Sequence, residues 1–373
     1  MDVVVTGIGL TSAIGELSQT WKGLLEQRSG IYFHQPFLEL EPKPLALIDK
    51  QPRSILPLTQ AIVLDALKDA DLEPPLVECS VVVGSSRGNQ AVWEQLAAGK
   101  GERSEWLQTL PNVAAIATAQ LIQSQAIVLS PMAACATGLW AIARGVELIQ
   151  SGQCQRVIAG AVEAPITPLT LVGFERMGAL AKTGAFPFDC DREGLVLGEG
   201  GAVLVLESVE LAKQRGAGIY GRVLGFGLTA DGYHVSAPEP GSRAAIAAIQ
   251  QCLERSRLTS RDVDYIHAHG TATRLNDQNE AHLIRQLFSS SIPVSSTKGL
   301  TGHTLGASGA LGAAFCLMAL KHQILPPNVG LRNSEFDLAI VRSAQLTTVE
   351  NALCFSFGFG GQNAVIAFSR YIE

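Results

Sequence analysis

The stretch that decides the fold occurs twice: AIVLDALKDADLEPPLVECSVVVGSSRG, residues 61–88, resembles AIAAIQQCLERSRLTSRDVDYIHAHGTAT, residues 245–273. Each copy has a helical pattern that leads through a loop into a short apolar run ending at a glycine. Aligning Leu72 with Leu258, or Gly84 with Gly270, gives the same spacing of 186 residues, about half of the 373-residue chain. The repeat predicts two related halves, with two equivalent sheets that meet at a shared site. Because the likeness is one of pattern more than identity, two unrelated βα units are the alternative.

Around this repeat, short β-branched runs alternate with helical patterns, which is typical of an α/β fold. Several runs are apolar at consecutive positions, which indicates strands covered on both faces. Strands are expected at residues 3–6, 80–83, 157–160, 202–206 and 265–269. Since no linker rich in Ser, Pro or charge interrupts the chain, we expect one compact unit of two halves, residues 1–215 and 216–373.

Each half also contains a helix built largely from small residues, at residues 131–152 and 301–322. Ala, Gly and Ser on nearly every face allow neighbouring elements to approach closely on all sides. We therefore expect two central buried helices whose N-terminal ends point into the shared site.

Composition narrows the class of protein. A hydrophobic content of 47% with 17% charged residues and a net charge of −6 describes a compact globular enzyme. Lys and Arg are dispersed, so a nucleic-acid surface is not expected. No apolar run reaches the roughly 18 residues of a membrane span, and no signal peptide is apparent, so the expected location is the cytoplasm. Seven scattered cysteines without a C-x-x-C pair predict no disulfide framework and no metal site.

Cys135 follows a strand-like run and a short turn, just before the first small-residue helix. The unpaired amides and the dipole of a helix N-terminus favour a thiolate there. The alternative is a small buried hydrophobe, as we expect Cys252, Cys316 and Cys354 to be.

Two histidines strengthen the prediction that Cys135 is a nucleophile. His269 ends an apolar strand just before Gly270, with His267 two residues earlier on the same face. His303 lies in a glycine-bounded turn that enters the second small-residue helix, where the amide ends oppose protonation and favour a neutral ring. Two neutral imidazoles that donate to a developing enolate oxygen suit decarboxylation better than proteolysis.

A glycine-rich stretch, GFGG at residues 358–361, follows the last apolar strand. Its side-chain-poor backbone can supply half of an oxyanion hole, together with the amide of Cys135, although a plain tight turn is the default for such a cluster.

With these residues in view, nearly the whole chain resembles the elongating type of β-ketoacyl-acyl-carrier-protein synthase, in the thiolase-like superfamily. The motifs that carry the resemblance are VVVTGIGLTSAIG, AACATG around Cys135, FPFDCDREGLVLGEGGAVLVLE, HAHGTATRLNDQNEA, SSTKGLTGHTLGASGA and SFGFGG. The resemblance implies a five-layered αβαβα fold from two duplicated halves, usually as a homodimer. It also implies acyl transfer from carrier-protein phosphopantetheine to the enzyme, then decarboxylative Claisen condensation with malonyl-acyl-carrier-protein, without a cofactor of the enzyme's own.

By motif position, the resemblance implies that Cys135 carries the acyl group and that His269 and His303 stabilise the enolate. It also implies an oxyanion hole from the amides of Cys135 and Phe359 and an acyl gate at Phe359 and Phe357. The other implied roles are a buried lysine that pairs with a glutamate and two threonines that hold the pantetheine arm; these residues are Lys298, Glu280, Thr271 and Thr273.

The chain departs from the family pattern mainly between Gly88 and Ala126, where the family has a longer excursion that helps form the dimer interface and the floor of the acyl pocket. This shortening leaves the chain-length preference open. A thiolase would need a second cysteine in SFGFGGQN, and a chain-initiating synthase would replace His303 with asparagine. A non-catalytic subunit like the chain-length factors is the remaining alternative, although such subunits typically lose the cysteine. Lys213 and Arg215 are guesses for carrier-protein docking.

Overall fold

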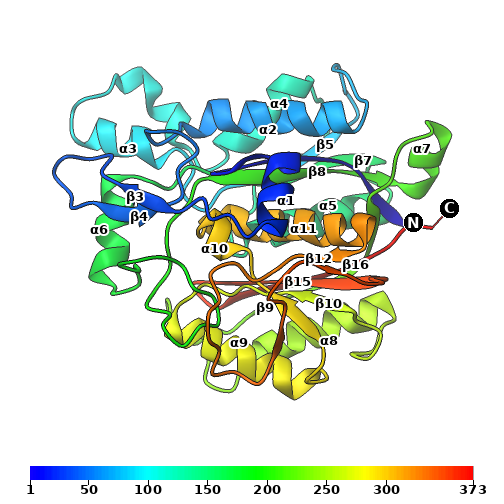
Figure 1. Ribbon diagram of the computed structural model, residues 1–373. Helices are drawn as coiled ribbons and strands as arrows, with labels where there is room; N and C mark the ends of the chain where they lie inside the picture. The colour runs from blue at the N-terminus through cyan, green and yellow to red at the C-terminus, as the bar shows by residue number, and fades with distance from the viewer. Residues whose placement is uncertain (373) are drawn as a thin grey trace.

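Five layers are visible in the computed structural model, which describes residues 1–372 (Figure 1). Helices α2 and α4 cover the outside of one sheet, α8 and α9 cover the outside of the other, and α5 and α11 lie between the sheets. The elements of the first half are β1 Val3–Ser12, β2 Gly15–Glu16, α1 Leu17–Leu25, β3 Tyr32–His34, β4 Lys43–Leu45, α2 Ile55–Asp69, β5 Ser80–Gly84, α3 Gln90–Ala97, η1 Arg103–Thr109, α4 Val113–Ile122, β6 Val128–Leu129, α5 Thr137–Gln150, β7 Arg156–Glu163, α6 Pro168–Arg176, β8 Gly200–Ser208 and α7 Val209–Gln214.

The second half follows with the same alternation of strands and helices. Its elements are β9 Gly221–Ala230, α8 Arg243–Ser256, β10 Tyr265–His267, α9 Arg274–Leu287, β11 Pro293–Ser295, α10 Lys298–Thr301, η2 Leu305–Ala307, α11 Ser308–His322, β12 Ile324–Leu325, β13 Ala339–Ile340, β14 Gln345–Leu346, β15 Asn351–Gly358 and β16 Gln362–Ser369.

The strand order repeats between the halves. The first sheet runs β6-β5-β7-β8-β1 and the second runs β11-β10-β15-β16-β9, with β13 added at its edge. In both, the three strands at the far edge pair in parallel and the remaining pairs are antiparallel. The two sheets join where β1 pairs with β9 over Val3–Val5. The two related halves that the repeat predicts and the thiolase-like α/β fold that the resemblance implies are therefore both confirmed.

The middle layer explains the small-residue helices. A Cβ on Gly138 of α5 would lie 2.6 Å from the backbone nitrogen of Ala310 on α11, so only glycine allows this approach. All residues of α11 from Ser308 to Leu320 are buried. The stretch 305–322 is long and apolar enough, by length and composition alone, to cross a membrane, so the expectation that no run is that long was too strict; 89% of this stretch is buried inside the protein.

Two expected elements differ in length. The strand expected at residues 265–269 ends at His267, so His269 lies in the loop beyond it. The helix expected from residue 131 begins at Thr137, and the one expected from residue 301 is a short helix, a turn and then α11. In both cases a glycine- or alanine-rich turn carries site residues ahead of the helix.

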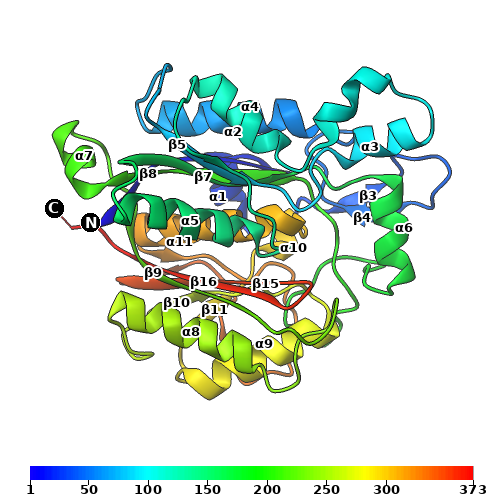
Figure 2. The ribbon, with the colours of Figure 1, turned by 180° about the vertical axis from the view of Figure 1, so that it is seen from behind.

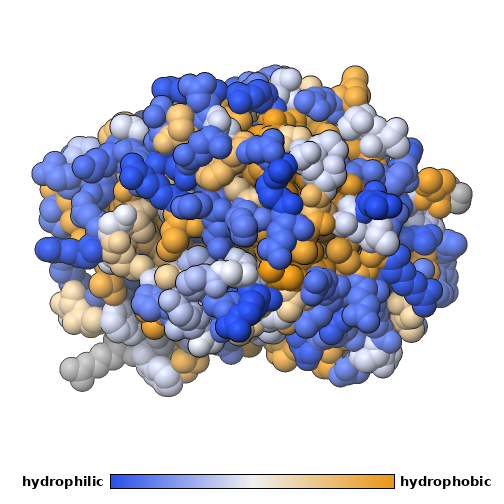
Figure 3. Space-filling view, turned by 90° about the horizontal axis from the view of Figure 1, so that it is seen from below, coloured by the Kyte–Doolittle hydropathy of each residue, from blue (hydrophilic) through white to orange (hydrophobic). Residues whose placement is uncertain are grey.

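The outer surfaces differ between the halves. Figure 3 shows the face formed by the second half, where hydrophilic residues dominate and apolar ones are scattered between them. In the first half, helix α3, at the upper right of Figure 2, contributes no buried residue. Trp93, Trp106 and Leu107 of the short excursion after β5 are exposed.

Candidate active site

Cys135 lies two residues before α5, in a strained turn. Ala134 has a φ of 47°, a left-handed conformation that costs a non-glycine residue about 1–2 kcal/mol. The Thr137 hydroxyl holds the turn, since it accepts from the Ala133 amide at 2.9 Å and donates to the Ala134 carbonyl at 2.7 Å. Ser356 of the second half donates to the Cys135 carbonyl at 3.0 Å. The nucleophile candidate is thus fixed from both halves.

The ionisation expected for Cys135 is wrong. Burial raises the pKa of its thiol to about 11, although the charge of Lys298 and the backbone amide of Phe359 favour the thiolate. The side chain is only 6% exposed and sits among apolar residues, so desolvation outweighs the helix N-terminus. At neutral pH the resting sulfur is a thiol, and it needs a base to become a nucleophile.

His269 and His303 come together edge to face, with their ring centroids 5.3 Å apart. Burial lowers the pKa of each ring well below its usual value, and the charge of Lys298 lowers both further. The neutral state expected for His303 agrees with this direction, but burial and Lys298 cause it, rather than the amide ends of α11. A 2.8 Å hydrogen bond joins Nδ1 of His303 to the Ser308 hydroxyl, which leaves Nε2 for the cavity.

Lys298 is buried behind the histidines at the start of α10. Its ammonium donates to the His269 carbonyl oxygen and lies 3.5 Å from His269 Nδ1. Among residues 1–372, it forms no ion pair with Glu280 within 4.0 Å, so the expected direct pair is wrong.

Glu280 instead accepts from the His269 amide at 2.6 Å and the Gly270 amide at 2.7 Å. Burial raises the pKa of Glu280 to about 7. Burial also lowers the pKa of Lys298, while the charge of Glu280 opposes that shift. The two groups thus interact through space, and the backbone of His269 lies between them.

The amides of Cys135 and Phe359 both lie close to the Cys135 sulfur. Over residues 1–372, neither donates a hydrogen bond to a backbone carbonyl, and the Phe359 amide approaches the Cys135 sulfur. Gly358 makes this possible, because a Cβ there would lie 2.7 Å from the Ala133 carbonyl oxygen and 3.0 Å from the Cys135 nitrogen. Two free donors beside a nucleophilic sulfur have the geometry of an oxyanion hole.

A cavity of about 370 Å³ unites most of the expected site residues. Cys135, His269, His303, Phe357, Phe359, Thr271 and Thr273 all line it. Thr271 and Thr273 share a 2.9 Å hydrogen bond, and Thr273 also caps α9. Phe174 and Met177 of the α6 region and Arg274 of α9 also line this cavity, although no sequence pattern pointed to them.

Glu163 is a further residue that sequence reasoning missed. It is fully buried at the end of β7, where its carboxylate accepts from both hydroxyls and one amide of Ser85 and Ser86. It also accepts from the Arg87 amide at 3.1 Å and from the Gly306 amide at 3.0 Å. A lone acid at the end of the apolar run VIAGAVE was the available signal. This carboxylate ties the loop after β5 to the turn that carries His303.

A second polar cluster lies behind the site. His267 shares a 3.2 Å hydrogen bond with Thr297, and its Nδ1 lies 4.0 Å from the Cys354 sulfur. Burial opposes ionisation of Cys354, but hydrogen bonds from Cys316 and His267 lower its pKa to about 6. Cys252, Cys316 and Cys354 all lie buried in the apolar core, as expected, and Cys354 differs in that its sulfur also lies next to the His267 ring.

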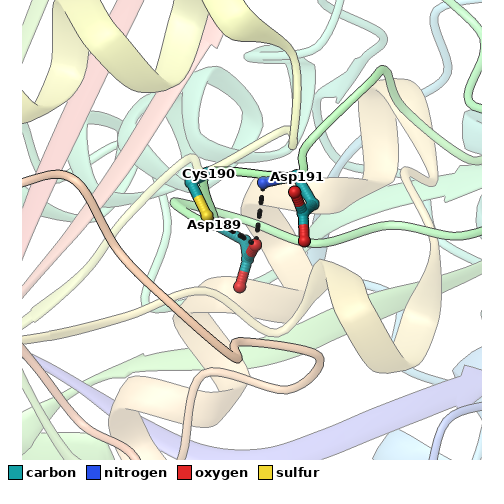
Figure 4. Close-up of side chains that lie close together, drawn as sticks. All are labelled: Asp189, Cys190 and Asp191. Carbon is teal, nitrogen blue, oxygen red and sulfur yellow. Dashed lines mark hydrogen bonds between the residues drawn. The ribbon is translucent and has the colours of Figure 1, made fainter.

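Asp189, Cys190 and Asp191 form the one group of acids and cysteine within residues 1–372 that is close enough to hold a metal ion (Figure 4). The buried Asp189 carboxylate already accepts from the amides of Asp191, Arg332 and Asn333. These hydrogen bonds lower the pKa of Asp189 although burial opposes them. In this cluster, the Asp189 carboxylate therefore anchors two loops by hydrogen bonds.

The two residues guessed for carrier-protein docking, Lys213 and Arg215, lie away from the cavity. Arg215 forms an ion pair with the buried Glu207 at 2.7 Å and donates to the Ala70 carbonyl. Both ribbon views place α7, which carries Lys213, at the end of the molecule opposite α6, whereas residues at the end of α6 line the cavity (Figures 1 and 2).

A cysteine, two neutral imidazoles and two free amides, placed where duplicated halves meet, define a condensing enzyme of the thiolase-like class. The family described as "Beta-ketoacyl synthase, N-terminal domain" matches residues 32–212, and "Beta-ketoacyl synthase, C-terminal domain" matches residues 220–332. A Synechocystis protein named 3-oxoacyl-[acyl-carrier-protein] synthase 2 is 36% identical over 99% of this chain and 98% of its own length. The chain belongs to the β-ketoacyl synthase family.

Solved structures agree with this assignment. The ishigamide ketosynthase/chain length factor is 27% identical, with a TM-score of 0.92 over 100% of this chain and 99% of that one. A ketosynthase in complex with its type II polyketide acyl-carrier protein, bound to the hexaketide, is also 27% identical, with a TM-score of 0.93 over 99% of both chains. The family is that of an acyltransferase, so the chain is an enzyme of that type.

Proposed function

We propose that this protein is a 3-oxoacyl-acyl-carrier-protein synthase in which Cys135 takes up the acyl group. The observation that carries the proposal is the shared cavity, which brings the Cys135 sulfur, both imidazoles and the Phe359 gate together. The names of the relatives support the substrate class, because they describe acyl-carrier-protein thioesters.

In the first half-reaction, the Cys135 thiol attacks the carbonyl of an acyl thioester. Because burial keeps the thiol protonated, a neutral imidazole accepts its proton as the new S–C bond forms. The amides of Cys135 and Phe359 stabilise the oxyanion of the tetrahedral intermediate. The donor's S–C bond then breaks, and the carrier thiol leaves with the proton.

In the second half-reaction, a malonyl thioester occupies the same cavity. Its carboxylate leaves as carbon dioxide, and His269 and His303 donate hydrogen bonds to the oxygen of the resulting enolate. Neutral rings suit this task, and both rings have pKa values held low by burial and Lys298. The enolate carbon attacks the acyl-cysteine carbonyl, the S–C bond to Cys135 breaks, and the released thiolate takes up a proton from water.

Thr271 and Thr273 are proposed to hold the pantetheine arm, and Phe357 and Phe359 to gate the acyl group, because all four line the cavity. Phosphopantetheine arrives with the carrier protein, and the proposed steps need no cofactor or metal of the enzyme's own. The proposed location is the cytoplasm, where thiols such as the seven free cysteines stay reduced. The set of acyl chains decides between fatty-acid, specialised-lipid and polyketide synthesis.

The proposed assembly is a homodimer through the edge of the first sheet. β6 is the edge strand there, and Met132 and Ile116 beside it are exposed. Light scattering on the purified protein should give twice the 39.5 kDa chain mass. A non-catalytic chain-length-factor-like subunit of a heterodimer is the second candidate, suggested by a neighbour of that description. Retention of Cys135, His269, His303 and Lys298 favours the catalyst.

The test is intact-mass analysis after incubation with acyl carrier proteins of several chain lengths. The parent should gain the mass of the acyl group, and Cys135→Ala should gain none. Cys190→Ala is the matched control, because Cys190 is exposed and lies outside the cavity, and it should acylate like the parent. No adduct on the parent with any donor would remove the catalytic proposal, and an adduct that survives in Cys135→Ala would assign the acyl group to another residue.

A further inference from the structure

Beyond Cys135, the apolar side of the site ends at a positive charge. Cys135 belongs to a cluster with Ile166, Leu171, Phe174, Leu195, Leu197 and Leu305, against which Phe359 packs. The rings of Phe359 and Phe174 stack with centroids 6.0 Å apart. The guanidinium carbon of Arg87 lies 5.6 Å from the centroid of the Phe174 ring. Phe359, Phe174 and Arg87 thus form a connected series of contacts beside the sulfur, and Arg87 is close enough for its charge to act on the Cys135 thiol.

The loop that carries Arg87 is held rigidly. The Arg87 amide donates to Glu163 at 3.1 Å, and the Gly88 amide donates to the Ser85 hydroxyl at 2.8 Å. Gly88 has a φ of 57°, which glycine adopts without strain. Because the buried Glu163 also holds Ser86, the backbone on both sides of Arg87 has little freedom. The side chain is therefore presented from a fixed point over Phe174.

The guanidinium itself has no carboxylate partner. No acidic oxygen among residues 1–372 lies within 4.0 Å of it, and its side chain donates no hydrogen bond to the part of the chain that the structure describes. Arg156 and Arg215, in contrast, both pair with the buried Glu207. Arg87 therefore keeps its donors available beside an apolar acyl site.

We propose that Arg87 is a specificity-determining residue that favours acyl groups with a distal carboxylate over unsubstituted alkyl chains of the same length. An acyl chain on Cys135 that passes Phe359 and Phe174 brings its far end to the guanidinium. A carboxylate there accepts two parallel charge-assisted hydrogen bonds, whereas a methyl end displaces water from the guanidinium without replacing its hydrogen bonds. This inference deepens the proposed function and rests on it.

The test compares acylation of Cys135 by heptanedioyl and heptanoyl thioesters of the same acyl carrier protein. In both, the Cys135 S–C bond forms, the donor S–C bond breaks and the carrier thiol leaves with the proton, so only the distal group differs. We expect the parent to acylate roughly tenfold faster with the heptanedioyl donor, the size of one charge-assisted contact discounted for partial exposure. Intact mass against time gives both rates.

The variants decide the role of the charge. Arg87→Leu should lose the preference or reverse it, mainly by faster acylation with heptanoyl, and Arg87→Lys should keep part of it because the charge remains without the planar fork. Arg261→Leu, which removes an exposed arginine of the second half, should leave the ratio unchanged.

The outcomes separate the two proposals. If both donors acylate Cys135 with the same ratio in the parent and in Arg87→Leu, the inference on Arg87 is wrong and the proposed function stands. If neither donor, nor any other acyl carrier protein, acylates the parent, the proposed function fails and this inference fails with it. A lower melting temperature of Arg87→Leu with an unchanged ratio would likewise overturn the inference, because it would show a purely structural role.

Discussion

The two halves share one strand order, but the loops at the ends of their equivalent strands treat polar groups in opposite ways. After β5, the hydroxyls of Ser85 and Ser86 and the amide of Ser86 donate to the buried Glu163. After β10, His269 and the neighbouring His303 turn ring nitrogens toward a cavity. In the first half these polar groups satisfy one another and fix loops of the site, whereas in the second half ring nitrogens stay free to act on a substrate.

Strand register makes this comparison specific. Val81 pairs with Ile158 in the first sheet, and the equivalent His267 pairs with Cys354 in the second. Glu163 and Phe359 therefore occupy equivalent places, five residues further along β7 and beyond β15. One is a buried carboxylate that fixes loops, and the other offers an amide and a ring to the cavity. Equivalent backbone positions in the two halves thus carry side chains with different roles.

The largest effect should come from removing a free donor in the second half. We expect His303→Ala to lower malonyl decarboxylation by about 10²–10⁴-fold, the usual value of a positioned imidazole, while Cys135 still becomes acylated. Carbon dioxide release from malonyl-acyl carrier protein measures the first step and intact mass the second. His322→Ala is the control, because that histidine lies at the far end of α11 and outside the cavity. Unchanged carbon dioxide release in His303→Ala would show that the free ring nitrogen does not serve the reaction.

A smaller effect is expected in the first half, where a substitution at Glu163 should change the free energy of unfolding. Glu163→Gln keeps one acceptor oxygen but turns an NH₂ group toward donors, so it should lower the free energy of unfolding by about 2–4 kcal/mol. Urea denaturation measures this change. Glu147→Gln is the matched control on the surface of α5, where its ion pair with Arg144 is worth well under about 1 kcal/mol. Equal stabilities of the two variants would mean that the Glu163 network does not hold the loops.

Sequence patterns predicted the architecture well because burial on both faces of strands leaves a strong signal. The repeat around Gly84 and Gly270 anticipated the duplicated strand order, and the small residues of α5 and α11 anticipated the buried middle layer. The ends of helices and strands were harder to predict. Strand β10 ends at His267, because the amides of His269 and Gly270 leave the sheet and donate to Glu280.

The ionisation state of Cys135 could not be derived from sequence, since it depends on contacts between distant segments. The helix N-terminus alone favoured a thiolate at Cys135, but the apolar neighbours of the folded protein raise the pKa of its thiol. Lys298 and Glu280 have opposite charges, yet the His269 backbone separates them. Phe174 and Arg87 had no pattern at all, because their roles arise only when α6 and the loop after β5 meet.

A moderate effect is expected from Lys298, whose positive charge lies behind the two imidazoles. Its substitution should change the pH dependence of decarboxylation. Both rings must be neutral to donate as proposed, and burial and Lys298 hold their pKa values below the ordinary value near 6.5. The rate of decarboxylation should thus fall only as pH drops below 6.5, when the rings become protonated. Lys298→Met removes a charge that opposes protonation, so the pKa values rise and the acid limb moves to higher pH.

The measurement is the pH profile of carbon dioxide release, compared as a ratio of the rate at pH 6 to that at pH 8. This ratio should fall severalfold in Lys298→Met, and it should not change in Lys68→Met, whose lysine is exposed on α2. An acid limb at the same pH in the parent and in Lys298→Met would mean that Lys298 acts by packing and hydrogen bonding, without an electrostatic effect on the rings.

The smallest effect concerns the strained turn through which the first half presents its one reactive group. Glycine at position 134 removes the left-handed strain of the Ala134 backbone, but it also adds freedom to the unfolded chain, so Ala134→Gly should raise stability by less than about 1 kcal/mol. Gln123→Gly is the control, because Gln123 has a φ of 55° at the end of α4, away from the cavity. Both variants should gain similar stability by urea denaturation, whereas only Ala134→Gly should acylate Cys135 more slowly, by a few-fold, because the Cys135 amide is held less firmly. If Ala134→Gly acylates as fast as Gln123→Gly, the strain at Ala134 has no part in positioning the nucleophile, and the Thr137 and Ser356 hydrogen bonds hold it alone.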